Sequence, residues 1–167
     1  MIRATPGRLL LTAFLLSLFP ANFPAHADVP ARVVSVHDGD TLTVLIERRQ
    51  VKVRLAEIDA PELKQPFGTR SKQSLSDLCF GKSATLDVRG QDRYKRTIAQ
   101  VTCAGTDANA EQVRRGLAWT YTRYARVSSP LFAIQQGAQH AHRGLWSDPA
   151  PVPPWDWRRN GKKSVTG

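Results

Sequence analysis

The stretch ARVVSVHDGDTLTVLIERRQVKVRLAEI, residues 31–58, decides the fold. It holds three runs rich in β-branched residues, at 31–36, 41–46 and 51–58, and the turn Asp38-Gly39-Asp40 and the polar segment 47–50 separate them. Short β-branched runs bounded by turn residues indicate strands. Because the separations are short, we expect the three strands to follow one another as a meander that ends at Ala60-Pro61.

The rest of the chain alternates between helical and strand patterns. We expect two further strands at 83–88 and 97–103, joined by a charged hairpin loop at 90–96. Helices are expected at 69–79, at 109–115 and from Ser128-Ser129-Pro130 to about residue 143, where a serine would cap the first turn. These elements predict an α+β domain, a five-stranded OB-fold β-barrel with three helices, an architecture that often binds nucleic acid.

The beginning of the chain has the pattern of a secretory signal peptide. Arg3 and Arg8 precede an apolar run at 9–19, and the small-residue triplet Ala25-His26-Ala27 follows it. The run is shorter than the roughly 20 residues that a membrane span needs, although an uncleaved anchor is the alternative. We therefore expect a signal peptide at 1–27, a domain at 28–148 and a Pro-rich basic tail at 149–167 of an exported protein, periplasmic or secreted.

Charge and cysteine content narrow the class of protein. The net charge of +10 attracts polyanions, of which nucleic acid is the commonest, and it leaves anionic lipid and acidic polysaccharide open. Export to an oxidising compartment favours a disulfide between the two cysteines, Cys79 and Cys103. The absence of a Cys-x-x-Cys motif argues against structural zinc. We expect a monomer with no stable membrane association after cleavage.

Acidic and arginine side chains gather at the predicted strand ends: Asp38, Asp40, Arg54, Asp59, Glu62 and Arg96. An arginine inside an apolar β-run is costly without anionic partners. In a straight strand Arg54 and Asp59 would face opposite sides, but the break before Pro61 can bend Asp59 and Glu62 back over the barrel. Carboxylates suit calcium or magnesium, and guanidinium groups suit phosphate oxygens. Together they are the parts that phosphodiester hydrolysis needs.

Several segments in the same order resemble the staphylococcal nuclease family, in its secreted bacterial form. They are DGDT at 38–41, RLAEIDAPE at 54–62, DRYKR at 92–96 and NAEQVRRGLA at 109–118. The segments GLW at 144–146 and PPWDWR at 153–158 resemble the ending of the secreted members. Lys95 departs from the family, which often has glycine there, and the segment after Glu62 is short.

The resemblance implies a role for each matching residue. Asp40, Asp59 and the backbone carbonyl of Thr41 match calcium ligands, and Asp38 matches a carboxylate nearby. Arg54 and Arg96 match the arginines that hold the scissile phosphate, and Glu62 matches the carboxylate that acts on the attacking water. Arg93 and Tyr94 fall near contacts to a terminal phosphate. The implied activity is calcium-dependent hydrolysis of DNA, RNA or both, leaving 3′-phosphate ends.

Other functions stay open on sequence alone. A non-catalytic OB-fold nucleic-acid-binding protein of the cell envelope would keep the basic charge but would not need Asp40, Asp59 and Glu62 together. An envelope protein could also use the domain only as a scaffold. An EF-hand is excluded, because Thr43 stands where its glycine belongs and Arg49 where its glutamate belongs. We interpret the histidines as non-catalytic and expect Trp155 and Trp157 to pack the tail onto the barrel.

Cleavage after Ala27 predicts that the exported protein begins at Asp28. The intact mass of the protein recovered outside the cytoplasm checks this expectation. A mass that still includes residues 9–19 would contradict it.

Overall fold

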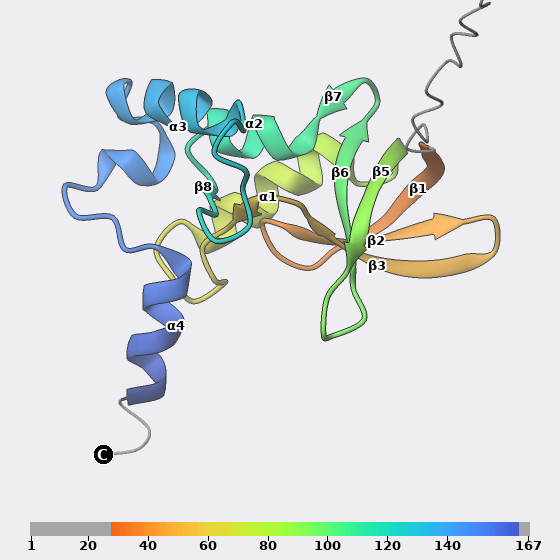
Figure 1. Cartoon of the computed structure of the whole chain (residues 1–167), viewed down its shortest axis with the longest axis horizontal. Coiled ribbons are helices and arrows are strands. Elements are labelled where there is room, and N and C mark those ends of the chain that lie inside the picture. The colour runs from red at the N-terminus through yellow and green to blue at the C-terminus, as the bar shows by residue number, and fades with distance from the viewer. Residues whose placement is uncertain (1–27, 164–167) are drawn as a thin grey trace, which may run out of the picture.

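The structure, a computed structural model, describes residues 28–163 (Figure 1). The predicted signal peptide lies outside the described residues. Within the described part of the chain, no helix is long and apolar enough to cross a membrane. The strands and the first three helices sit together, and a fourth helix lies at the C-terminal end (dark blue in Figure 1).

Five strands form the barrel. They are β1 (Val29–Val36), β2 (Thr41–Ile46), β3 (Arg49–Leu55), β5 (Ser83–Gln91) and β6 (Thr97–Cys103). Neighbours pair antiparallel in the order β3-β2-β1-β5-β6, and a parallel pairing of β3 with β6 closes the barrel. The predicted α+β class and the five-stranded barrel are therefore confirmed.

Three strands of two residues each accompany the barrel. β7 (Thr106–Asp107) extends the sheet beyond β6. β4 (Ile58–Asp59) pairs antiparallel with β8 (Trp119–Thr120) in a small second sheet. The third predicted strand is therefore divided, because β3 ends at Leu55 and the chain turns before β4.

The three predicted helices are present, with bounds shifted by a few residues. They are α1 (Gly68–Cys79), α2 (Ala108–Arg114) and α3 (Leu131–His140), followed by a 3₁₀ turn, η1 (Gly144–Ser147). The structure adds a fourth, α4 (Pro154–Lys163), inside the segment that the sequence predicts only as a Pro-rich tail. The serine cap expected before α3 is wrong: Ser129 instead donates its hydroxyl to Glu57 Oε2 at 2.6 Å.

Alternating side chains of the strands fill the barrel. The most completely buried are Val33, Leu42, Val44, Val53, Leu86, Ala99 and Val101. Asn109 of α2 is also fully buried. Its Oδ1 accepts a hydrogen bond from Val101 N at 2.9 Å, and its Nδ2 donates one to Ala56 O at 2.9 Å. These bonds satisfy backbone groups that burial would otherwise leave unpaired, and they fix α2 against β6.

Aromatic rings attach the C-terminal segment to the domain. The ring centroids of Trp119 and Trp146 are 4.3 Å apart, and Trp155 of α4 lies 5.8 Å from Trp119. Trp155 also stacks on Tyr121, with centroids 5.1 Å apart and ring planes nearly parallel. Aromatic pairs at such distances add to the area that they bury. Trp155 therefore packs the tail onto the domain, as the sequence predicts.

A disulfide joins the last residue of α1, Cys79, to the last residue of β6, Cys103. Both residues are buried, and their sequence separation is 24. The bond therefore ties the end of α1 to the end of β6.

Replacing both cysteines by alanine should lower the free energy of unfolding by about 3 kcal/mol, because the loop that the bond closes no longer restricts the unfolded chain. Urea denaturation of the oxidised protein and of the double variant measures the difference. Thiol titration of the oxidised, denatured protein should find no free thiol. Two free thiols would contradict the pairing.

Candidate active site

The turn between β1 and β2 presents two carboxylates. Asp40 is buried; its Oδ2 accepts from Ala60 N at 2.6 Å, and its Oδ1 accepts from Thr41 Oγ1 at 3.0 Å. Asp38 Oδ1 accepts from the backbone N–H of Asp40 at 3.1 Å, a bond typical of Asx turns. Both carboxylates are thus fixed in place by the turn and by the chain near Ala60.

Helices α1 and α2 hold this turn through contacts with Gly39. Gln112 of α2 donates to Gly39 O at 2.7 Å and to Ser71 O of α1 at 3.0 Å. Gly39 is in such close contact with α1 that a Cβ atom there would lie 1.8 Å from Ser71 Oγ. Only glycine fits between Asp38 and Asp40, so the spacing of the two carboxylates depends on this contact.

Arg54 connects the turn to the bend after β3. It pairs across the sheet with Thr41, and its guanidinium forms ion pairs with Asp40 Oδ1 at 2.6 Å and with Asp59 Oδ1 at 2.8 Å. The Asp59 side chain is only 1% exposed. Glu57 has a positive φ of 62°, which turns the chain between β3 and β4. This turn brings Asp59 to Arg54. The expected bend is therefore observed, and it begins before Pro61.

Arg158 of α4 completes the cluster, and the sequence did not indicate it. Its Nη2 donates to Asp59 Oδ2 at 2.6 Å and its Nη1 donates to Glu62 Oε1 at 2.7 Å. From sequence, Arg158 and Arg159 are equivalent basic tail residues; in the structure Arg159 pairs with Asp156 of its own helix. The spacing of three residues between Trp155 and Arg158 would have put both on one face of a helix, had a helix been expected there.

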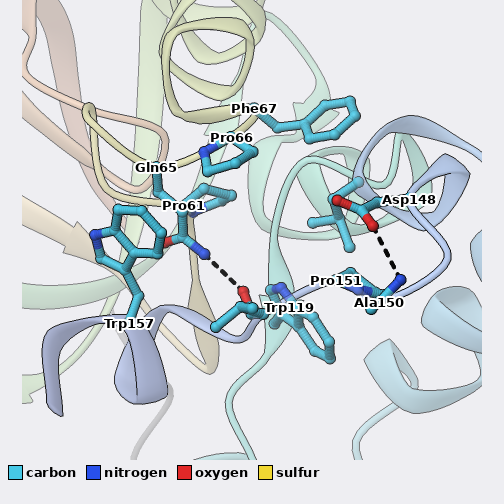
Figure 2. Close-up of a pocket in the computed structure, with 11 residues that line it drawn as sticks. Pro61, Gln65, Pro66, Phe67, Trp119, Asp148, Ala150, Pro151 and Trp157 are labelled. Carbon is cyan, nitrogen blue, oxygen red and sulfur yellow. Dashed lines mark hydrogen bonds between the residues drawn. The ribbon is translucent and has the colours of Figure 1, made fainter. Parts of the chain in front are cut away.

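A pocket beside the cluster shows how α4 is held (Figure 2). It lies between the segment after Glu62 and the tail, and its lining includes Pro61, Gln65, Phe67, Trp119, Val152 and Trp157. Gln65 is buried and donates to Val152 O at 2.6 Å, the bond dashed at the centre of Figure 2. Gln65 Oε1 accepts from Glu62 N at 3.2 Å, so one side chain links the tail to the segment that carries Glu62.

The cluster carries excess negative charge that burial makes costly. Burial, and then the charge of Asp40, raise the pKa of Asp38 to about 6. Burial also raises the pKa of Asp59, although the hydrogen bond from Arg158 opposes the rise. For Arg54, burial would lower the pKa, but the charges of Asp40 and Asp59 outweigh it and raise the pKa. Four carboxylates thus face two guanidinium groups, which is an environment that favours an additional cation.

The donor set fits a hard divalent cation. In the range 28–163, no group of three or more His, Cys, Asp or Glu side chains is arranged to hold a metal ion. Asp40 and Asp59 nevertheless converge on one guanidinium. The Thr41 carbonyl, which the resemblance implies as a third oxygen donor, instead accepts from His37 N at 2.9 Å and from Asp38 N at 3.4 Å within the turn. Oxygen-only donors suit calcium or magnesium rather than zinc or copper. His37 is not part of this set, since its Nε2 lies 2.8 Å from Thr43 Oγ1.

Arg96 directly precedes β6 and forms its ion pair within the hairpin. Its Nε donates to Asp92 Oδ2 at 2.7 Å within the β5–β6 hairpin. The next residue, Thr97, pairs with Val53 and Ile98 pairs with Arg54, so Arg96 stands just before the strand that neighbours Arg54. Lys95 has a positive φ of 63°, a left-handed backbone conformation that glycine adopts more easily than lysine.

The structure does not bring Arg93 and Tyr94 to the carboxylates. Tyr94 is 65% exposed, and the Arg93 guanidinium lies 4.8 Å from the centroid of its ring. The Arg96 guanidinium also lies over this ring, at 5.6 Å. The hairpin thus presents two arginines and one ring to solvent, next to the site.

A barrel with buried carboxylates and arginines at one end defines a class of domain suited to bind a metal ion and a phosphate. A family model, described as staphylococcal nuclease homologue, matches residues 52–148. An uncharacterized endonuclease of Haemophilus influenzae is 43% identical over 93% of this chain and 87% of its own length. A micrococcal nuclease of Shigella flexneri is 40% identical over 86% of this chain and 88% of its own. The chain belongs to the staphylococcal nuclease family.

Replacing Gly39 by alanine should lower the free energy of unfolding by about 1–3 kcal/mol, because the added Cβ overlaps Ser71 and Ala60. Gly137 of α3 is the matched control: a Cβ there meets nothing within 4 Å, so Gly137→Ala should leave stability unchanged or raise it by up to about 1 kcal/mol. Urea denaturation of both variants compares them. Equal effects would show that the turn is not held by this contact.

Proposed function

We propose that this protein is a calcium-dependent nuclease that hydrolyses phosphodiester bonds of DNA, RNA or both and leaves 3′-phosphate ends. The observation that carries the proposal is that Arg54 pairs with both Asp40 and Asp59, and that Arg158 links Asp59 to Glu62, so that three carboxylates share one cluster. A protein that only binds nucleic acid needs basic side chains, not three carboxylates gathered at the phosphate-binding end of a barrel. The printed names of the two relatives, an endonuclease and a micrococcal nuclease, support the same class of activity.

Each residue has a part that its position supports. A bound calcium ion would be held by Asp40 and Asp59, and it would supply positive charge against the scissile phosphate. Arg54 lies between the two aspartates, so its guanidinium can donate to a phosphate oxygen beside them. Arg96, at the neighbouring strand end, can donate to a second oxygen once it leaves Asp92.

Glu62 is suited to act on water because it is much more accessible than Asp40 and Asp59. Its side chain is 44% exposed, against 1% for Asp59 and 8% for Asp40. In the proposed reaction a water oxygen bonds to phosphorus and its proton passes to Glu62. The P–O5′ bond breaks, and the 5′ oxygen takes a proton from solvent. The products are a 3′-phosphate and a 5′-hydroxyl.

Export is part of the proposal. The disulfide between Cys79 and Cys103 supports it, because such bonds persist in oxidising compartments and are rare in the cytosol. We therefore place the enzyme in the periplasm or outside the cell, acting as a monomer on nucleic acid there.

The test is cleavage of a short DNA and a short RNA by the purified protein, with calcium and with a chelator. We expect cleavage only with calcium, and products that accept no further nucleotide at the 3′ end until a phosphatase removes the phosphate. Binding without cleavage in calcium would favour the non-catalytic envelope protein instead.

Substitutions then assign the roles by single-turnover rate and calcium affinity. Arg54→Lys and Arg96→Lys should each lower the rate about a hundredfold or more, since lysine keeps the charge but loses the two-point contact. Asp40→Asn should weaken calcium binding, whereas Glu62→Gln should lower the rate and affect calcium binding less. His37→Ala is the control and should change little. Near wild-type rates for both lysine variants would refute the phosphate contacts.

A further inference from the structure

Arg158 holds the oxygens on which the proposed metal site depends. Its Nη2 bonds Asp59 Oδ2 at 2.6 Å, and its Nη1 lies 3.3 Å from Asp59 Oδ1 and 2.7 Å from Glu62 Oε1. The remaining contact of Asp59 Oδ1 is Arg54 at 2.8 Å. Both oxygens of this carboxylate therefore face guanidinium groups, one from the barrel and one from the C-terminal helix.

The position of Arg158 does not depend on this ion pair alone. Trp155, one turn earlier on α4, stacks on Tyr121, and Gln65 holds the chain just before the helix through Val152 O. Pro154, the first residue of α4, is buried. α4 is thus docked on the domain by contacts that lie outside the cluster, and it directs Arg158 toward Asp59 and Glu62.

A divalent cation and Arg158 compete for Asp59 Oδ2. A metal ligand must offer a lone pair at about 2.3–2.6 Å, and a second positive group on the same oxygen would repel the ion. Arg54 is held inside the barrel wall, with its side chain 15% exposed, whereas the Arg158 side chain is 40% exposed and carried by the last helix. Arg158 is therefore the partner that can move away from Asp59 when a cation binds.

We propose that Arg158 is a positioning residue of this active site, which neutralises Asp59 until metal binds and then holds Glu62. The proposal rests on the proposed metal-dependent function. The proposal has two separate consequences, called the first and the second demand below. In the metal-free protein Arg158 competes with the cation for Asp59, so it lowers metal affinity. In the metal-bound protein its remaining bond to Glu62 orients the carboxylate that acts on water, so it raises the rate.

Calorimetric titration with calcium chloride tests the first demand without any nuclease assay. Arg158→Met keeps much of the aliphatic stem but loses the guanidinium, and we expect it to bind calcium about fivefold or more tightly than the wild type. Arg159→Met removes the same charge one residue away, from a side chain that is 67% exposed and paired within its helix, and should change affinity less than about twofold. Damage to the fold would weaken binding, the opposite direction. Arg158→Met binding no more tightly than Arg159→Met would overturn the competition.

Arg158→Lys is the second variant, in case methionine disturbs α4. One ammonium can contact Asp59 or Glu62 but cannot bridge them in the same way, so the calcium affinity should fall between those of the wild type and Arg158→Met. Melting temperatures of all three variants with the disulfide intact show whether the domain is preserved. A lysine variant that binds calcium more weakly than the wild type would also contradict the competition.

A double-mutant cycle at saturating calcium tests the second demand. Arg158→Met should lower the single-turnover rate, and the double variant with Glu62→Gln should be no slower than Glu62→Gln alone within about twofold, because Arg158 acts through Glu62. Effects that multiply would overturn this positioning role. A wild-type protein that binds calcium but cleaves nothing would refute the proposed function, while the titration would still decide the competition for Asp59.

Discussion

The buried ion pairs of Arg54 are the interaction on which the rest of the site depends. A guanidinium enclosed in the wall of a barrel is tolerated only with anionic partners close by, and breaking such a pair leaves an uncompensated charge. The partners come from two different connections, the β1–β2 turn and the bend after β3. Arg54 thus requires the two connections to lie close together. The contacts of α1 and α2 with the turn keep Asp40 at the position where it can pair with Arg54.

Much of the fold could be predicted because it rests on local pattern. The strands at 41–46 and 97–103 have the expected bounds, since β-branched residues and turn residues delimit them clearly. The sequence also predicted that Arg54 needs acidic partners, because that need follows from the charge of an arginine in an apolar strand. The location of the bend was not. Glu57 adopts a positive φ that its residue type disfavours, and distant backbone bonds hold it, such as Tyr121 N to Glu57 O at 2.7 Å.

The C-terminal helix shows where sequence reasoning failed. Prolines at 149–154 favour an extended segment, yet the last of them begins α4, where proline is well tolerated at the first helical turn. What places Arg158 in the site is the packing of Trp155 on Tyr121, a contact between residues far apart in the chain. Ser129 is a similar case, because Glu57 takes the hydroxyl that was expected to cap α3. Local signals cannot reveal such partners.

The parallel pairing of β3 with β6 has a consequence for the order of events during folding. Val53 pairs with Thr97 although α1, β5 and the hairpin lie between them in the chain, and such long-range contacts slow folding. Arg54 belongs to this pairing and Arg96 directly precedes it, so their relative positions are set only when the barrel closes. Under the proposed export, an unfolded chain leaving the cytoplasm would hold every residue of the site but lack the assembled site. Under the proposed function, the nucleic acid of the producing cell would then meet no active nuclease until the barrel had closed elsewhere.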